Sequence, residues 1–136
     1  MVITSNYKGQ LAVSKAEIRA FELGYIPCRP LFDCRYDLII DNFKSSPQRI
    51  QIKYANGTPK NTEGIVIAKL GYEDRHKKCR TYQADEVDGL VVYIPKIDKL
   101  CYFPNKIYLG KTTLTIRLEK PKNNYKRVIY AKDYLW

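Results

Sequence analysis

The feature that most constrains this chain is residues 35–54, where two short apolar runs flank a polar turn. The runs read as strands, and Asp41 to Pro47 has the composition of the turn between them. Side chains alternate along a strand, so Gln51 and Lys53 share one face of the second run. If the strands pair as a hairpin, these two side chains and the carboxylate of Asp37 converge at one end of the pair.

A helix is predicted upstream of this hairpin, from about Tyr7 to Leu23. Thr4 to Asn6 offers N-caps, no proline interrupts the segment, and Gly24 is well placed as the C-cap. Two stripes at helical spacing indicate that the helix packs on two sides. One stripe is Tyr7, Leu11, Ser14, Ile18 and Phe21, and the other is Ala12, Ala16, Ala20 and Leu23.

Downstream, the pattern predicts a sheet whose strands alternate with polar segments. Pro27 and Pro30 favour an edge or bend for residues 25–30. We therefore expect an α/β or α+β fold, a helix followed by a mixed sheet, as a single domain over residues 1–136 with one core. Strands are expected at 65–70, 90–94, 100–103 and 112–118, loops at 55–64, 71–80 and 120–127, a short helix or turn at 82–87, and an apolar-aromatic segment at 128–136.

The net charge of +10 and the pI near 9.4 favour a polyanionic partner, most simply nucleic acid. A basic protein that binds no polyanion is the alternative. The cationic run at 75–80 is either a solvated loop or a phosphate-contacting one. In either reading, contacts to phosphates are expected more often than contacts to base edges. The candidate DNA-binding residues are Lys60, Arg75, His76, Lys77, Lys78 and Arg80.

The four cysteines form no CxxC pair and only one histidine accompanies them, which argues against structural zinc. The N-terminus lacks the features of a signal peptide, so we expect reduced, partly buried thiols. The longest apolar run, Leu90 to Pro95, is too short to cross a bilayer. A soluble intracellular protein without a membrane segment is the expectation.

The three convergent side chains suit the hydrolysis of a phosphodiester. A divalent cation held by a carboxylate can neutralise phosphate oxygens, activate water and stabilise the leaving oxygen. Mg²⁺ keeps several waters, so Asp37, the amide oxygen of Gln51, the backbone carbonyl of Ile52 and a substrate phosphate can suffice as ligands, and Mn²⁺ is a possible substitute. Lys53 then orients the water or offsets phosphate charge. The alternative is a strand-start cap at Asp37 and a solvent-facing Gln51 and Lys53.

The chain resembles the PD-(D/E)XK nucleases, and within them the small homing endonucleases of bacterial, chiefly cyanobacterial, group I introns. That branch similarly has Gln-x-Lys where the wider superfamily has an acidic residue before x-Lys. The segments that carry the resemblance are Lys8-Gly9, Gly24-Tyr25, Arg29-Pro30, Tyr36 to Ile39, Gln51-Ile-Lys53, Asp85 with Asp88, Val91 to Pro95, Pro121 to Asn124 and Ala131 to Tyr134.

The resemblance implies a mixed central sheet flanked by helices and Mg²⁺-dependent cleavage of both strands of an intronless DNA site. It also implies a homo-oligomer, dimer or tetramer, in which Tyr130, Tyr134 and Trp136 make core or subunit contacts, and a cytoplasmic, nucleoid-associated location in a bacterium. Relatives have a Glu in the first helix at the position of Val13. Glu17, one turn later, is the candidate replacement and the fourth catalytic residue, and Asp33 is a weaker one.

Three other functions stay open at this point. A Holliday-junction resolvase of the same superfamily would also be small, basic and oligomeric. A non-catalytic DNA-binding module with a degenerate site is made plausible by the neutral Gln51 and by Val13. A basic structural protein unconnected with DNA is the third.

Overall fold

The computed structural model describes residues 4–55, 64–120 and 127–136. Its helical elements are few and its strands are short. The helices are α1 (Ser5–Glu22), α2 (Asn105–Tyr108) and the 3₁₀ helix η1 (Ala131–Asp133). The strands are β1 (Ile26–Cys28), β2 (Leu38–Asp41), β3 (Gln48–Tyr54), β4 (Ile65–Lys69), β5 (Tyr72–Glu73), β6 (Cys79–Arg80), β7 (Gly89–Ile94), β8 (Lys99–Pro104) and β9 (Thr113–Arg117).

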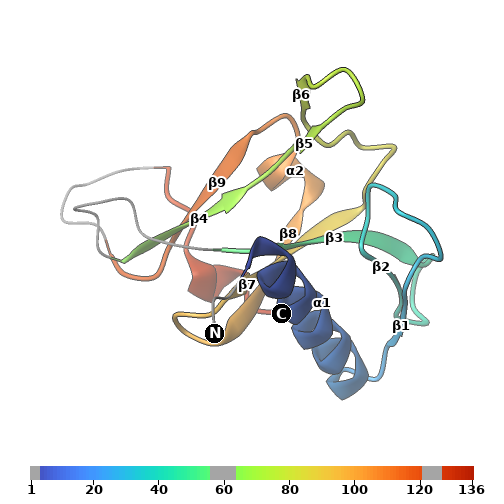
Figure 1. Cartoon of the computed structure of the whole chain (residues 1–136). Helices are drawn as coiled ribbons and strands as arrows, with labels where there is room; N and C mark the ends of the chain where they lie inside the picture. The colour runs from blue at the N-terminus through green and yellow to red at the C-terminus, as the bar shows by residue number, and fades with distance from the viewer. Residues whose placement is uncertain (1–3, 56–63, 121–126) are drawn as a thin grey trace.

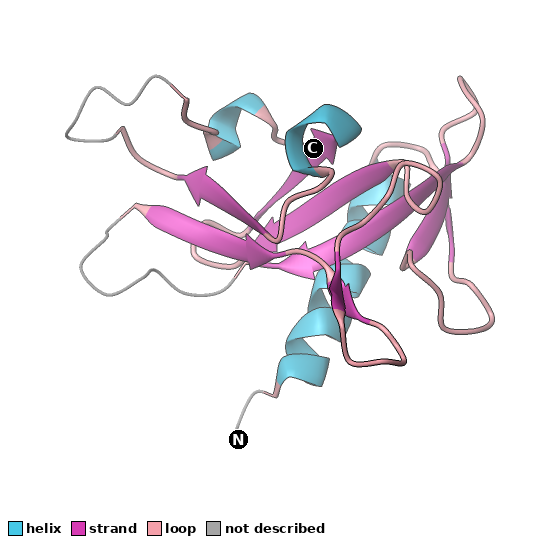
Figure 2. Ribbon diagram, turned by 90° about the horizontal axis from the view of Figure 1, so that it is seen from above, coloured by secondary structure: helices cyan, strands magenta, loops and turns pink. Residues whose placement is uncertain are grey.

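A mixed five-stranded sheet forms the centre of the fold, in the order β1-β2-β3-β7-β8. The β3 and β7 strands run parallel, and the other neighbours run antiparallel. The helix α1 lies across one face of the sheet, while the separate β4–β9 ribbon and α2 lie on the other side of the molecule (Figures 1 and 2). The predicted mixed α+β architecture is confirmed, with β1 at the edge of the sheet as Pro27 indicates.

Both ends of α1 follow the sequence signals. The side chain of Thr4 accepts a hydrogen bond from the backbone amide of Tyr7 at 3.3 Å, and Gly24 just after the helix has φ +77°. The alanine stripe is buried against the sheet, where small side chains let the helix come close.

Most of the stripe of Tyr7, Leu11, Ser14, Ile18 and Phe21 does not pack, so the prediction that the helix packs on two sides is wrong. Leu11 alone of the five packs against the buried residues beneath the helix. Tyr7, Ile18 and Phe21 are 52%, 57% and 66% exposed. The described part of the chain supplies one sheet for α1 to rest on, and no described element covers the outer side of the helix. Periodicity identified the apolar positions correctly but not the surface that they face.

The central sheet divides the buried residues into two clusters, instead of the one core that the sequence predicted. One cluster joins α1 to the inner side chains of β2, β3 and β7, including Leu38, Ile52 and Val91. The other joins the opposite side chains of β7, such as Val92, to the β4–β9 ribbon and α2. Every residue of β7 is buried, because both clusters use it.

The apolar-aromatic end of the chain packs on β8. The rings of Phe103 and Tyr134 lie 4.8 Å apart, and the backbone amide of Tyr102 donates to the carbonyl of Tyr134 at 2.8 Å. Tyr134 therefore has a core role.

Residues 71–80 were expected to form a loop, and that prediction is wrong, since β5 and β6 pair there as a small hairpin. Each strand has only two residues, too few to show alternation in the sequence. The hairpin projects at the top of the view in Figure 1, away from the central sheet.

None of the helices within the described ranges is long and apolar enough to span a membrane. Cys28, Cys34 and Cys79 are exposed free thiols, contrary to the expected partial burial, and Cys101 is buried. Burial raises the pKa of the Cys101 thiol to about 11.

Candidate active site

The predicted hairpin of residues 35–54 is present as β2 and β3, which pair antiparallel with Leu38 opposite Ile50. Local hydrogen bonds form its turn. The Asp41 carboxylate accepts from the amide of Phe43 at 2.8 Å, and the Asn42 side chain accepts from the amide of Lys44 at 3.0 Å. These Asx contacts satisfy backbone donors that the ladder leaves free at the turn.

Asp37 bridges the open end of this strand pair. Its backbone amide donates to the carbonyl of Ile50 at 2.9 Å, and its Oδ2 accepts from the backbone amide of Ile52 at 2.8 Å. The carboxylate is thereby held beside the part of β3 that carries Gln51 and Lys53. The charges of Asp37 and Lys53 also act on each other, so the structure brings these two predicted site residues near one another.

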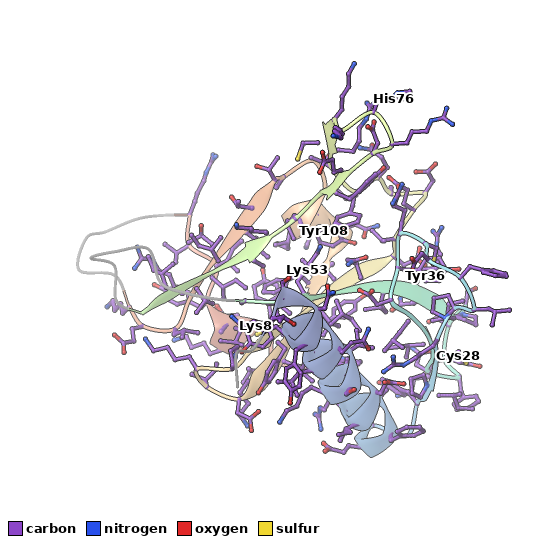
Figure 3. The ribbon with its side chains drawn as sticks, viewed as in Figure 1. Lys8, Cys28, Tyr36, Lys53, His76 and Tyr108 are labelled. Carbon is purple, nitrogen blue, oxygen red and sulfur yellow. The ribbon has the colours of Figure 1, made fainter. Side chains whose placement is uncertain are left out.

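Gln51 and Lys53 lie on the side of the sheet away from α1. Ile50 and Ile52 pack in the α1 cluster, so the residues that alternate with them point to the opposite face. Lys53 Nζ lies 5.4 Å from the centre of the Tyr82 ring. Figure 3 shows Lys53 near the middle of the molecule, far from the labelled His76 on the β5–β6 hairpin.

Partial burial perturbs the charged groups of this site. It raises the pKa of Asp37, an effect opposed by the Ile52 amide and by the charges of Lys53 and Arg29. It lowers the pKa of Lys53, and the charge of Asp37 opposes that shift. Such opposite shifts in adjacent groups are typical of functional sites.

Tyr82 forms an aromatic wall of the site. Burial raises the pKa of its hydroxyl to about 12, and the negative charge of Asp37 adds to the effect. The phenol is therefore neutral at physiological pH. No sequence signal identified Tyr82 as a neighbour of Lys53, because 29 positions of chain separate them.

Gln51 is buried, and its Nε2 donates to the backbone carbonyl of Ile52 at 3.4 Å. The side-chain amide of Gln51 and the backbone carbonyl of Ile52, both predicted to ligate a metal beside Asp37, are thus direct neighbours. Both offer oxygen atoms.

The carboxylate of Glu17 is paired with the guanidinium of Arg29. Arg29, just beyond β1, donates to Glu17 through Nε at 3.1 Å and through Nη2 at 2.5 Å, and its Nη1 donates to Gln10 at 3.1 Å. The Glu17 hydrogen bond raises the pKa of Arg29, to which the charge of Asp37 also contributes. Arg29 thus contacts Glu17 directly and acts on Asp37 through its charge. The Arg29-Pro30 pair was noted in the sequence, but its place at the site was not predicted.

Val13, the position at which the resemblance led us to expect a Glu, is buried beneath α1, and Asp33 is exposed in the loop after β1.

Arg49 and Asp88 tie β3 to the start of β7 next to the site. Asp88 accepts from the backbone amide of Arg49 at 2.8 Å and from its Nε and Nη2, each at 3.0 Å. This contact lowers the pKa of Asp88 and leaves its carboxylate occupied by a guanidinium.

The donor set fits a hard cation that keeps much of its water. The described residues contain no group of three or more His, Cys, Asp and Glu side chains that could hold a metal ion. Asp37, Gln51 and Ile52 have one carboxylate and two neutral oxygens, and the Ile52 backbone contacts both the Asp37 carboxylate and the Gln51 amide group. Mg²⁺ accepts such a set when waters and a phosphate complete its shell.

The predicted DNA-binding residues gather on the β5–β6 hairpin. Arg75, His76, Lys77 and Lys78 are exposed in its turn. Arg80 is also exposed, but its Nε pairs with Asp74 at 2.9 Å. Lys60 lies outside the described residues.

Comparison with known proteins agrees with the fold. A family model described as PD-(D/E)XK endonuclease matches residues 3–136. The solved structure of a bacterial homing endonuclease, I-Ssp6803I, is similar over 97% of this chain and 88% of that chain, with a TM-score of 0.74 and 20% identity. The crystal structure of MepB covers 74% of each chain with a TM-score of 0.46 and 14% identity, too distant to support an argument. No curated protein sequence matches this chain.

Proposed function

This chain belongs to the PD-(D/E)XK endonuclease family, and from that premise we propose that residues 1–136 form a single nuclease domain that cleaves double-stranded DNA at a specific site, in the manner of an intron homing endonuclease. The observation that supports the proposal is the position of the Asp37 carboxylate at the open end of the β2–β3 hairpin, where it accepts from the amide of Ile52, the residue between Gln51 and Lys53. We infer that it acts in a bacterial cytoplasm on nucleoid DNA.

Nucleases of this family generally use a divalent metal ion. We propose Mg²⁺, with Mn²⁺ as a substitute, held by the carboxylate of Asp37, the amide oxygen of Gln51 and the carbonyl of Ile52. When bound, the ion supplies an acidic water and charge neutralisation at the scissile phosphate. A site with one carboxylate binds the ion weakly alone, so the DNA phosphate contributes strongly to its occupancy.

Lys53 provides a positive charge beside Asp37 in a partly desolvated place, where charge acts strongly on a developing phosphate anion. Its Nζ orients the attacking water and offsets the phosphate charge. Asp37 accepts from the Ile52 amide, which fixes the carboxylate before substrate arrives.

Glu17 acts in this proposal together with Arg29. The guanidinium orients the Glu17 carboxylate and adds positive charge near Asp37. Glu17 thereby serves as the fourth residue of the site from the helix side.

DNA is held by basic residues outside the centre, with Arg75, His76, Lys77, Lys78, Arg80 and Lys60 as the proposed contacts. The net charge of +10 supports a polyanionic substrate.

Cleavage of both strands needs two such centres, so we propose a homo-oligomer, a dimer or a tetramer. Large apolar side chains on the surface support it: Leu31 is 88% exposed and Phe32 is 79% exposed.

A non-catalytic DNA-binding module is the second candidate, favoured by the lack of a carboxylate cluster among the described residues. The deciding experiment is a cleavage assay on duplex DNA that spans the insertion junction of the intron carrying this reading frame, with Mg²⁺ or Mn²⁺. Cleavage of the duplex supports the homing function, whereas retained binding without cleavage supports the module. A four-way junction that competes better than the linear duplex would instead indicate a resolvase.

A further inference from the structure

The β5–β6 hairpin is a short two-stranded ribbon with a cationic tip. Tyr72 pairs with Arg80 and Glu73 with Cys79, and the turn between the strands is exposed. The hairpin projects from the body of the molecule, with His76 at its outer end (Figures 1 and 3).

The carboxylate of Asp74 stabilises this turn through three hydrogen bonds. Its Oδ1 accepts from the backbone amides of His76 at 2.8 Å and Lys78 at 3.0 Å, and its Oδ2 accepts from Arg80 Nε at 2.9 Å. Lys77 has φ +59°, which the turn requires. A turn already fixed in this way loses little conformational entropy on binding.

The base of the hairpin is fixed as firmly as its tip. Gly71 has φ +88°, and a Cβ there would lie 2.6 Å from the backbone carbonyl oxygen of Arg80. Only glycine allows β5 and β6 to close at this point.

Aromatic contacts join the base of the hairpin to the catalytic centre. The Arg35 guanidinium lies 3.6 Å from the centre of the Tyr72 ring, and the Tyr72 ring lies 5.7 Å from that of Tyr82. The Tyr82 ring in turn faces Lys53. These contacts hold the hairpin at a defined position relative to the site.

The charge of the tip lies on exposed side chains. Asp74 is neutralised by Arg80, which leaves Arg75, Lys77 and Lys78 as the exposed cations of the turn. A two-stranded ribbon fits the major groove of B-form DNA, where Arg and Lys pair with guanine edges.

We propose that the β5–β6 hairpin enters the major groove of the DNA duplex and reads base pairs at a fixed distance from the bond that Asp37 and Lys53 cleave. The inference rests on the proposed endonuclease function for its substrate. Arg75, Lys77 and Lys78 supply the base-edge contacts, and Asp74, Tyr72 and Tyr82 are positioning residues.

The test is a binding selection from a randomised duplex library, with Ca²⁺ in place of Mg²⁺ so that no DNA is cut. The full chain is compared with the variant Arg75→Gln/Lys77→Gln/Lys78→Gln. A control variant removes the same charge at the other end of the molecule, as Lys96→Gln/Lys99→Gln/Lys132→Gln, where all three residues are exposed. Thermal unfolding establishes that each variant is folded.

We expect the natural chain and the control to select the same consensus, and the hairpin variant to lose one contiguous block of it. Duplexes with 7-deazaguanine in that block, which removes a major-groove acceptor, should bind the natural chain more weakly and the hairpin variant unchanged. Asp74→Ala keeps every cation of the hairpin but loosens its turn, so this variant should select the same block of the consensus less strongly.

An unchanged consensus in the hairpin variant, or no consensus with the natural chain, overturns the inference. A reduced salt dependence with an intact consensus would show that the hairpin contacts phosphates only, which also overturns it. Since the selection scores binding, absence of cleavage by the natural chain contradicts the proposed nuclease function and leaves this result standing.

Discussion

Arg29 holds Glu17 through Nε and Nη2, at 3.1 and 2.5 Å, and the charge of the same guanidinium acts on the carboxyl of Asp37. The pair matters because the position of the expected helical carboxylate is taken by the buried Val13. We propose that Glu17, held by Arg29, takes the place of that carboxylate.

Glu17→Gln should lower the cleavage rate by about 10- to 100-fold, as does the loss of groups that orient a metal site, while DNA binding is retained. Single-turnover cleavage and gel-shift measurements check this. Glu22→Gln is the matched control, since Glu22 pairs with Arg19 on the same helix at 3.0 Å. Equal rates for both variants and the natural chain would exclude Glu17 from the site.

Lys53→Met should raise the free energy of unfolding near neutral pH. Burial lowers the pKa of Lys53 in the folded chain. At pH values between this lowered pKa and the ordinary pKa of lysine, the unfolded chain therefore binds one more proton than the folded chain. Stability of the natural chain therefore rises with pH through that window, and the advantage of Lys53→Met should shrink there. Urea unfolding at neutral and alkaline pH measures the difference, and an advantage independent of pH would contradict the assigned cause.

The cleavage rate should change with pH as Lys53 titrates, and Tyr82→Leu should shift this part of the pH–rate profile to higher pH. The Tyr82 ring lies against Lys53 Nζ, and its loss admits water that stabilises the ammonium and raises the pKa of Lys53. Tyr82→Phe keeps the ring and is the control. If the pH–rate profile of Tyr82→Leu is the same as that of the natural chain, the ring does not desolvate Lys53.

Two glycine substitutions should change stability in opposite directions. A Cβ at Gly89 would lie 2.5 Å from the hydroxyl oxygen of Tyr102, so Gly89→Ala should cost about 1–3 kcal/mol through overpacking at β7. Gly9 lies in α1 with open space around it, and Gly9→Ala should stabilise the helix by about 0.5–1 kcal/mol. Chemical denaturation measures both. A Gly89→Ala chain as stable as the natural one would contradict the close packing of Tyr102 on β7.

The hairpin that carries Asp37, Gln51 and Lys53 could be predicted because its signals are local. Apolar alternation defines the strands, the segment after Asp41 forms the turn, and the period of a strand assigns the two β3 side chains to one face. The ends of α1 were predictable for the same reason, from Thr4 and Gly24.

The parts that the sequence did not reveal depend on contacts between distant residues. The β5–β6 hairpin is stabilised by Asp74 and by the packing of Tyr72 on Arg35 and Tyr82, none of which has a periodic signature. Arg29 reaches Glu17 only because β1 lies beside α1.

The exposed stripe of α1 shows a different limit. Helical spacing marks Ile18 and Phe21 as one apolar face, but spacing does not state whether that face meets the sheet of the same chain or another surface. Only the arrangement of the whole molecule decides it.

If Asp37 and Lys53 perform phosphodiester hydrolysis, their removal must abolish cleavage, which is tested by comparing Asp37→Asn and Lys53→Ala with the natural chain on a duplex spanning the intron insertion junction. Binding is followed by gel shift and Mg²⁺-dependent strand cleavage by denaturing electrophoresis. We expect both variants to bind the duplex with nearly the natural affinity and to cut neither strand. Cleavage at the natural rate by either variant would contradict this expectation.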